Sequence, residues 1–157
     1  MERRMWVTAL VVLLTGGAMG GGSGRAAAQG ASFECSERTL RGTYGIQLQG
    51  TRPVPPAAGG GVESVIGVVI RTYDGVGEFT QVDNVKGSVT GMVPDRPGVG
   101  TYEVSPDCSA IVRLEPGPGI VLEERLVIVH DGSEIRSIVG SPQGVMVSAV
   151  HKRVDRR

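Results

Sequence analysis

Two histidines and a few acidic residues are the side chains of this sequence that could do acid-base chemistry. His130 precedes Asp131, which would suit a base and its orienting carboxylate, but adjacent residues of a strand point to opposite faces. Asp131-Gly132 is also typical of a hairpin turn. His151 lies alone in a predicted strand, and two histidines with no fixed separation do not indicate a metal site. The sequence therefore predicts no catalytic residue.

Three acidic residues and one glycine-rich stretch are the candidates for binding a metal ion or a phosphate. Asp74, Glu78 and Asp83 lack the Asp-x-Asp-x-Asp-Gly density of a calcium loop and suit solvated hairpin positions. Gly59-Gly60-Gly61 is followed by neither Gly-Lys-Ser/Thr nor a helix, so it predicts a flexible loop. No metal and no cofactor is expected.

The two cysteines, Cys35 and Cys108, are expected to form one disulfide. No Cys-x-x-Cys is present, and no histidine lies within several residues of either cysteine, so a catalytic or metal-binding thiol is disfavoured. Closing so long a loop is worth roughly 4 kcal/mol in the chain-entropy model. The pair should be a large part of the stability of a small domain.

Each cysteine accompanies a copy of Gly-Thr-Tyr, at Gly42-Thr43-Tyr44 and Gly100-Thr101-Tyr102. Both tyrosines fall on apolar strand faces, which is typical of core packing. If the fold encloses a cavity, the hydroxyls of Tyr44 and Tyr102 are the candidate ligand contacts.

The elements that position these residues are short strands. Thr39–Gln49 alternates apolar and polar residues with the period of two of a half-buried strand. Val62–Tyr73 and Glu78–Val85 flank Asp74-Gly75, a strong hairpin signal. Further strands are predicted at Lys86–Val93, Gly100–Val104, Ala110–Glu115, Ile120–His130, Glu134–Val139 and Val145–Val150, with breaks at Gly50–Gly61 and Pro94–Gly98.

This pattern predicts an all-β fold, an antiparallel meander of about eight strands. Sequential hairpins favour an up-and-down closed barrel, because closure removes exposed strand edges; a sandwich is the alternative.

The chain resembles a group of small exported bacterial proteins of unassigned function. The resemblance rests on Gly42-Thr43-Tyr44, on Asp74-Gly75-Val76-Gly77, and on Gly100-Thr101-Tyr102 leading to Pro106-Asp107-Cys108. It covers nearly the whole chain after the leader. Ser105 stands where the group has Asn, and Ser109-Ala110 where it has Thr-Gly, and both changes suit a turn. The group's fold is similar to the calycin-like barrels, including allene oxide cyclase, and this likeness transfers no catalytic residue.

The N-terminus predicts an export signal at residues 1–28, leaving 29–157 as a single barrel domain. Arg3-Arg4 begin it, Met5–Leu14 form a short apolar run, and Ala26-Ala27-Ala28 suit cleavage. The run is about ten residues, half of a bilayer span of roughly 20, so no membrane anchor is expected. The general secretory route is favoured over the twin-arginine route. The expected location is the periplasm or the extracellular space.

Charge excludes one class of partner. The chain carries 16 basic and 16 acidic residues and shows no basic stripe, which argues against nucleic acid. The sequence favours binding of a small apolar molecule in a barrel cavity over catalysis. The alternatives are an isomerase or cyclase of the allene oxide cyclase type, and an envelope interaction protein with a filled core. Polar residues converging in a pocket would favour an enzyme, and a uniformly aliphatic pocket a carrier.

Overall fold

The computed structural model describes residues 33–117 and 119–154. These residues belong to one compact unit, Ser32–Arg157. The predicted leader, residues 1–28, lies outside the described residues. Within them, no helix has the length and apolar character of a membrane span.

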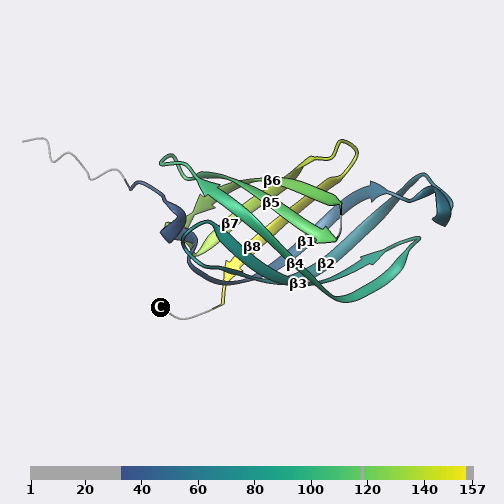
Figure 1. Cartoon of the computed structure of the whole chain (residues 1–157), viewed down its shortest axis with the longest axis horizontal. Helices are drawn as coiled ribbons and strands as arrows, with labels where there is room; N and C mark the ends of the chain where they lie inside the picture. The colour runs from purple at the N-terminus through teal and green to yellow at the C-terminus, as the bar shows by residue number, and fades with distance from the viewer. Residues whose placement is uncertain (1–32, 118, 155–157) are drawn as a thin grey trace, which may run out of the picture. The chain divides into compact units, whose positions relative to one another are not determined.

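The described chain forms a closed antiparallel barrel of eight strands in sequence order, with β8 pairing back onto β1 (Figure 1). The predicted all-β barrel is confirmed, and the sandwich is not the arrangement adopted. The strands are β1 (Gly42–Pro53), β2 (Val62–Tyr73), β3 (Glu78–Gly87), β4 (Gly91–Val104), β5 (Ser109–Gly117), β6 (Ile120–Val129), β7 (Glu134–Ser141) and β8 (Met146–Arg153). Three short 3-10 helices complete the described part: η1 (Glu37–Leu40), η2 (Pro56–Ala58) and η3 (His130–Gly132).

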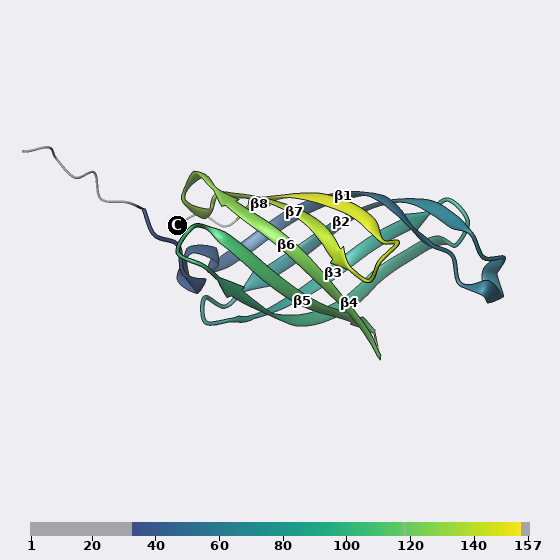
Figure 2. The ribbon, with the colours of Figure 1, turned by 90° about the horizontal axis from the view of Figure 1, so that it is seen from above.

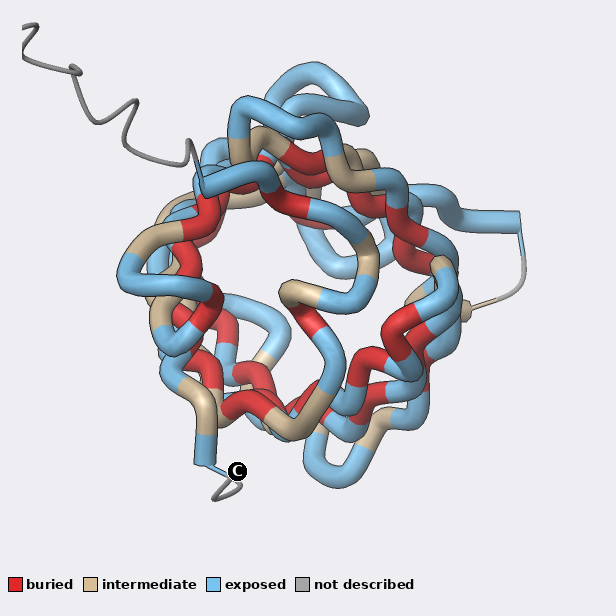
Figure 3. The backbone as a smooth tube through the Cα atoms, turned by 90° about the vertical axis from the view of Figure 1, so that its left-hand side faces the viewer, coloured by how far each residue is buried: buried red, intermediate tan, exposed pale blue. Residues whose placement is uncertain are grey.

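The alternation of residue types decides which side chains face the interior. Tyr44 and Ile46 of β1 are buried, as is Tyr102 of β4, which confirms the predicted inner faces. Viewed along the barrel, buried and exposed residues alternate around the ring (Figure 3). The core therefore lies inside the barrel, and the outer face meets solvent.

The first strand differs from its predicted range, Thr39–Gln49. Thr39 belongs to η1, where the amide of Ser36 donates to its hydroxyl at 3.0 Å. The strand runs on to Pro53, because Gly50–Pro53 pairs with the start of β2. At Gly50 a Cβ would lie 2.0 Å from the carbonyl oxygen of Met146, so only glycine permits this close pairing with β8.

The loop predicted at Gly50–Gly61 is therefore shorter and more regular than expected. Its first residues extend β1, and Pro56–Ala58 form η2. Proline is tolerated in the first turn of a helix because its missing N–H has no partner there anyway. The amide of Val54 donates to the carbonyl of Gly61 at 2.9 Å and closes the loop.

The predictions for residues 86–98 are also corrected. Instead of a separate strand at Lys86–Val93, β3 ends at Gly87 and β4 begins at Gly91. The predicted break at Pro94–Gly98 lies within β4, because Pro94 and Asp95 form a bulge opposite Asn84. The amide of Asp95 donates to the Asn84 side chain at 3.2 Å. Pairing with β5 starts only at Val99, so this part of β4 is an edge, where proline is tolerated.

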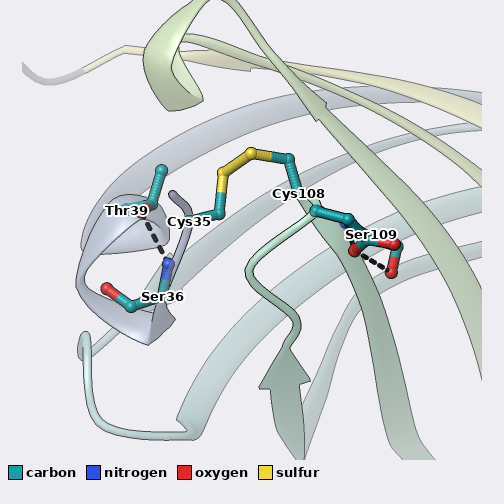
Figure 4. Close-up of a disulfide and its surroundings, with 6 residues drawn as sticks. Cys35, Ser36, Thr39, Cys108 and Ser109 are labelled. Carbon is teal, nitrogen blue, oxygen red and sulfur yellow. Dashed lines mark hydrogen bonds between the residues drawn. A yellow bond between two sulfur atoms is a disulfide. The ribbon is translucent and has the colours of Figure 1, made fainter. Parts of the chain in front are cut away.

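One end of the barrel is closed by η1 and the predicted disulfide. Cys35 and Cys108 are bonded, with Cα atoms 4.9 Å apart, which confirms the expected pair (Figure 4). The preceding turn is also as expected, since the Cys108 amide donates to the carbonyl of Ser105 at 3.0 Å. The opposite end carries η2 and the β3–β4 turn (Figure 2).

An aromatic cluster fills the interior beneath this closed end. The Tyr73 ring lies 5.5 Å from Tyr44, 5.6 Å from Phe79 and 5.0 Å from Tyr102, centroid to centroid. Leu40 of η1 is fully buried in the same core. These rings form a floor, and the space above it lies toward the other end.

Candidate functional site

A cavity of about 100 Å³ lies inside the barrel above the aromatic cluster. Aliphatic side chains form much of its wall, among them Ile46, Val69 and Ala149. Polar side chains also line it: Arg52, Arg71, Gln81, Asp83, Arg96, Glu124, Ser137, Ser148 and His151. A cavity of this size with polar groups can hold a few waters or a small organic group.

Arg71 is the centre of the buried polar network. Its guanidinium donates from Nη2 to Glu124 Oε1 at 2.8 Å and from Nη1 to Glu124 Oε2 at 3.1 Å. Nε donates to Gln81 Oε1 at 2.8 Å, and Nη1 also donates to the Tyr73 hydroxyl at 3.1 Å. The guanidinium carbon lies 4.5 Å from the centroid of the Phe79 ring. Arg71 is thus fixed by four side chains from three strands.

The Arg71–Glu124 pair is ionised although both residues are buried. Burial is the largest influence on each and disfavours charge, but mutual attraction and the paired hydrogen bonds outweigh it. The pKa of Glu124 consequently lies below its ordinary value and that of Arg71 above it. Burial raises the pKa of Tyr73, so its hydroxyl stays protonated. The charges of Arg71 and Glu124, at the inner end of the cavity, therefore balance each other.

The network continues from Gln81 toward the open end. Gln81 Nε2 donates to Asp83 Oδ2 at 3.2 Å. Arg96 donates to both oxygens of Asp83, at 2.9 Å from Nε and 3.0 Å from Nη2. Asp83 is buried, whereas the Arg96 side chain is 30% exposed. The pair thus lies where the cavity meets solvent.

Among the described lining residues, His151 has a buried side-chain nitrogen that makes no hydrogen bond at all. Its side chain is fully buried, and Nε2 lies 2.9 Å from the hydroxyl of Ser137. Nδ1 is buried and has no hydrogen-bond partner within residues 33–117 and 119–154. Burial, and then the positive charge of Arg71, lower the pKa of His151 to about 3, so the imidazole is neutral. A neutral imidazole carries one N–H and one lone pair.

A third buried carboxylate, that of Glu63, holds the β3–β4 turn beside the opening. Glu63 accepts hydrogen bonds from the amides of Thr90 and Val89 at 2.9 and 3.0 Å, and from the Thr90 hydroxyl at 2.8 Å. Arg52 Nε donates to it at 2.8 Å. The Thr90 amide bond, with the other bonds, outweighs burial and lowers the pKa of Glu63 to about 2. The turn is therefore tied to β1 and β2.

The two tyrosines proposed as ligand contacts lie at the closed end. The Tyr44 hydroxyl donates to the carbonyl of Gly132, and the Tyr102 hydroxyl accepts from the amide of Gly75 at 2.9 Å. Neither residue lines the cavity. Their hydroxyls hold η3 and the β2–β3 turn against the barrel.

Three other candidates from the sequence, His130, Asp131 and Asp74, lie in the connections between strands. His130 and Asp131 are exposed in η3. Asp74 accepts from the amides of Val76, Gly77 and Glu78, which lowers its pKa and caps the turn. No group of three metal-ligating side chains occurs in the described part of the chain.

The inner faces of β2 and β6 carry charged residues as well as apolar ones. Residues 65–70 of β2 are nearly all apolar, yet Ile66, Val68 and Ile70 point outward. Arg71 shares its face with Val69 and Tyr73, and Glu124 shares its face with Leu126. Strict alternation from Tyr73 and Leu126 would have identified both charged residues as inward.

An apolar groove on the outer surface is a separate feature. It is lined by residues that include Val68, Ile70 and Val82, and it has a volume of about 570 Å³. No buried charge pair lies among its lining residues. The interior cavity is the better candidate because it combines enclosure with fixed polar groups.

Comparison with known proteins identifies no family. No family model and no curated protein matches the chain. Among solved structures, it is similar to the S-type phycobiliprotein lyase CPES from Guillardia theta, with 8% sequence identity and a TM-score of 0.42. The match covers 77% of this chain and 92% of that one. At this distance the likeness carries no functional inference.

Proposed function

We propose that this protein is an exported binding module that holds a small, largely apolar molecule inside its barrel. The observation that carries the proposal is the cavity of about 100 Å³, in which a fully buried histidine keeps one ring nitrogen without a partner among the described residues. Buried polar atoms are normally satisfied, so an unsatisfied one beside a cavity indicates a missing partner. The apolar walls would bind the body of the ligand, and the polar side chains at the inner end of the cavity, among them His151 and Arg71, would bind the inner end of the ligand.

The setting outside the cytoplasm is part of the proposal. The leader predicted at residues 1–28 and the Cys35–Cys108 disulfide support it, since disulfides persist in oxidising compartments. The echoed Gly-Thr-Tyr pattern supports a place among the small exported bacterial proteins described above.

The test uses a variant that fills the cavity without removing a polar group. Ala149 lines the cavity, so Ala149→Leu should occupy it. Ser64→Leu adds comparable volume to an exposed position on β2 and is the matched control. A set of fragments of about six to eight heavy atoms would be screened by saturation-transfer NMR, with expected Kd values on the order of millimolar.

The wild type and Ser64→Leu should bind the same fragments, and Ala149→Leu should lose them while remaining folded by circular dichroism. If no fragment binds the wild type, or Ala149→Leu binds unchanged, the proposal is overturned and a filled-core structural protein is the better account.

An isomerase or cyclase of the allene oxide cyclase type is the second candidate. Glu124 and His151, both ionisable, line the same cavity, and polar side chains that converge in a pocket favour an enzyme over a carrier. Turnover of an unsaturated epoxide panel that is abolished by Glu124→Gln, with the variant still folded by circular dichroism, would support it. Absence of turnover, together with fragment binding, favours the binding module.

A further inference from the structure

The hydrogen-bond partners of His151 and Ser137 specify which ring nitrogen carries the proton. If Nε2–H donated to Ser137, the serine proton and the Nδ1 lone pair would both lack partners within the described chain. If Ser137 donates to Nε2 instead, only Nδ1–H is left over. Unsatisfied buried groups are costly, so the second arrangement is favoured. His151, which lines the cavity, then carries an N–H donor without a partner among the described residues.

Arg71 supplies a second unused donor beside the same cavity. A guanidinium has five N–H groups, and Gln81, Tyr73 and Glu124 accept four of them. The fifth N–H group, on Nη2, has no hydrogen-bond acceptor among the described residues. The two N–H groups that have no partner among the described residues, on His151 and on Arg71 Nη2, are therefore both donors.

We infer that the inner end of the ligand is a neutral carbonyl group, whose oxygen accepts from His151 Nδ1–H and from Arg71. This inference rests on the proposed binding function and specifies its ligand class: small ketones, esters, lactones or amides. A carbonyl oxygen has two lone pairs and no proton to place. An alcohol must also find an acceptor for its proton.

A carboxylate fits this site poorly. Arg71 is already paired with Glu124, and the other arginines that line the cavity, Arg52 and Arg96, are paired with Glu63 and Asp83. A second anion would therefore lie beside the Glu124 carboxylate without an unpaired arginine among the described lining residues. Like charges close together in a buried site are strongly disfavoured. The paired charges of Arg71 and Glu124 thus disfavour the binding of carboxylic acids in their ionised form.

The test compares three probes that share a five-membered ring: cyclopentanone, cyclopentanol and cyclopentanecarboxylate. Kd values are taken from ¹H–¹⁵N titrations of the wild type. Cyclopentanone should bind about ten-fold more tightly than cyclopentanol, as expected for one unsatisfied buried group, and the carboxylate should not bind. If cyclopentanol or the carboxylate binds as tightly as the ketone, the inference is overturned while the binding module stands. If none of the three binds, the inference is overturned, and the fragment screen decides separately whether the binding module stands.

Ser137→Ala tests the proton position separately. Long-range ¹H–¹⁵N spectra of the wild type should show His151 protonated at Nδ1. Ser137→Ala should lose this preference and reduce the ketone-to-alcohol selectivity toward unity, whereas Ser64→Ala, at an exposed position on β2 that does not line the cavity, should leave both unchanged. A wild-type spectrum with the proton on Nε2 would overturn the inference even if the protein binds fragments.

Discussion

At the scale of single residues, the buried Arg71–Glu124 pair sets the character of the interior. Desolvating two charges is expensive, and the pair is tolerated because two hydrogen bonds join its members and further bonds satisfy the guanidinium. Each buried charge is therefore compatible with a stable fold only while the other charge is present.

This conditional stability predicts strong coupling between the two positions. Glu124→Leu leaves the Arg71 charge buried without its partner and should lower the free energy of unfolding by about 3–5 kcal/mol. The double variant Arg71→Met/Glu124→Leu should recover much of that loss, because neither charge remains. Urea denaturation of the wild type, both single variants and the double variant measures the coupling. Simple additivity of the two single effects would show that the pair does not act as a unit.

The inner faces of single strands were predictable from the sequence only where apolar residues alternate with polar ones. Tyr44 and Ile46 were placed correctly for that reason. In β2, apolar residues occupy both faces, so hydrophobicity alone gave no direction, and Arg71 was missed. The unpartnered Nδ1 of His151 depends on contacts between β7 and β8, which no local pattern contains.

At the scale of elements, Glu63 joins the β3–β4 turn to the neighbouring strands through four accepted hydrogen bonds. Its pKa falls from 4.5 to about 2 in the folded protein. A carboxylate with a depressed pKa stabilises the fold above its unfolded pKa, and that stabilisation is lost as pH falls through the folded pKa.

Glu63→Gln should therefore lower the melting temperature at pH 7, because an amide places an NH₂ group where the carboxylate accepts. The difference from the wild type should be constant above about pH 5 and should shrink between about pH 4.5 and pH 2. Thermal melts across this range measure it. Glu103→Gln is the control, since the Glu103 side chain is 77% exposed and should change little. A difference that does not depend on pH would contradict the proposed role of the carboxylate.

Most elements were predictable because turn residues mark their ends. Asp74-Gly75 joins β2 and β3 as expected. The bulge in β4 was not foreseen, because Pro94 and Pro97 read locally as a break. Their tolerance depends on β4 lacking a β5 partner before Val99, which is a property of the sheet.

At the scale of the whole molecule, the disulfide joins the segment before η1 to the turn between β4 and β5 across 73 residues. The disulfide lowers the conformational entropy of the unfolded chain, and this stabilises the folded protein by roughly 4 kcal/mol in the chain-entropy model.

Replacing both cysteines, Cys35→Ser/Cys108→Ser, should lower the melting temperature markedly. Binding of fragments measured in the cold should remain largely intact, because the disulfide lies at the closed end and does not line the cavity. Differential scanning calorimetry and the same NMR titration provide the two readouts. An unchanged melting temperature would contradict the stabilising role of the disulfide.

The barrel as a whole was predictable from regular turn spacing and the absence of amphipathic helices. Each strand pairs with the next strand in the sequence, so the order of strands in the barrel is the order in the chain. The volume and chemistry of the cavity could not be predicted in this way, because they depend on how side chains from several strands meet inside.

The central claim, that the interior binds a small molecule, is tested most directly by locating a bound probe. Val85 and Ala149 line the interior cavity without lining the outer groove, whereas Val68 and Ile70 line the groove without lining the cavity. Intermolecular nuclear Overhauser effects between cyclopentanone and the methyl groups of these four residues therefore distinguish the two locations. The account predicts effects to Val85 and Ala149. Effects confined to Val68 and Ile70 would place the probe on the outer surface and contradict the account.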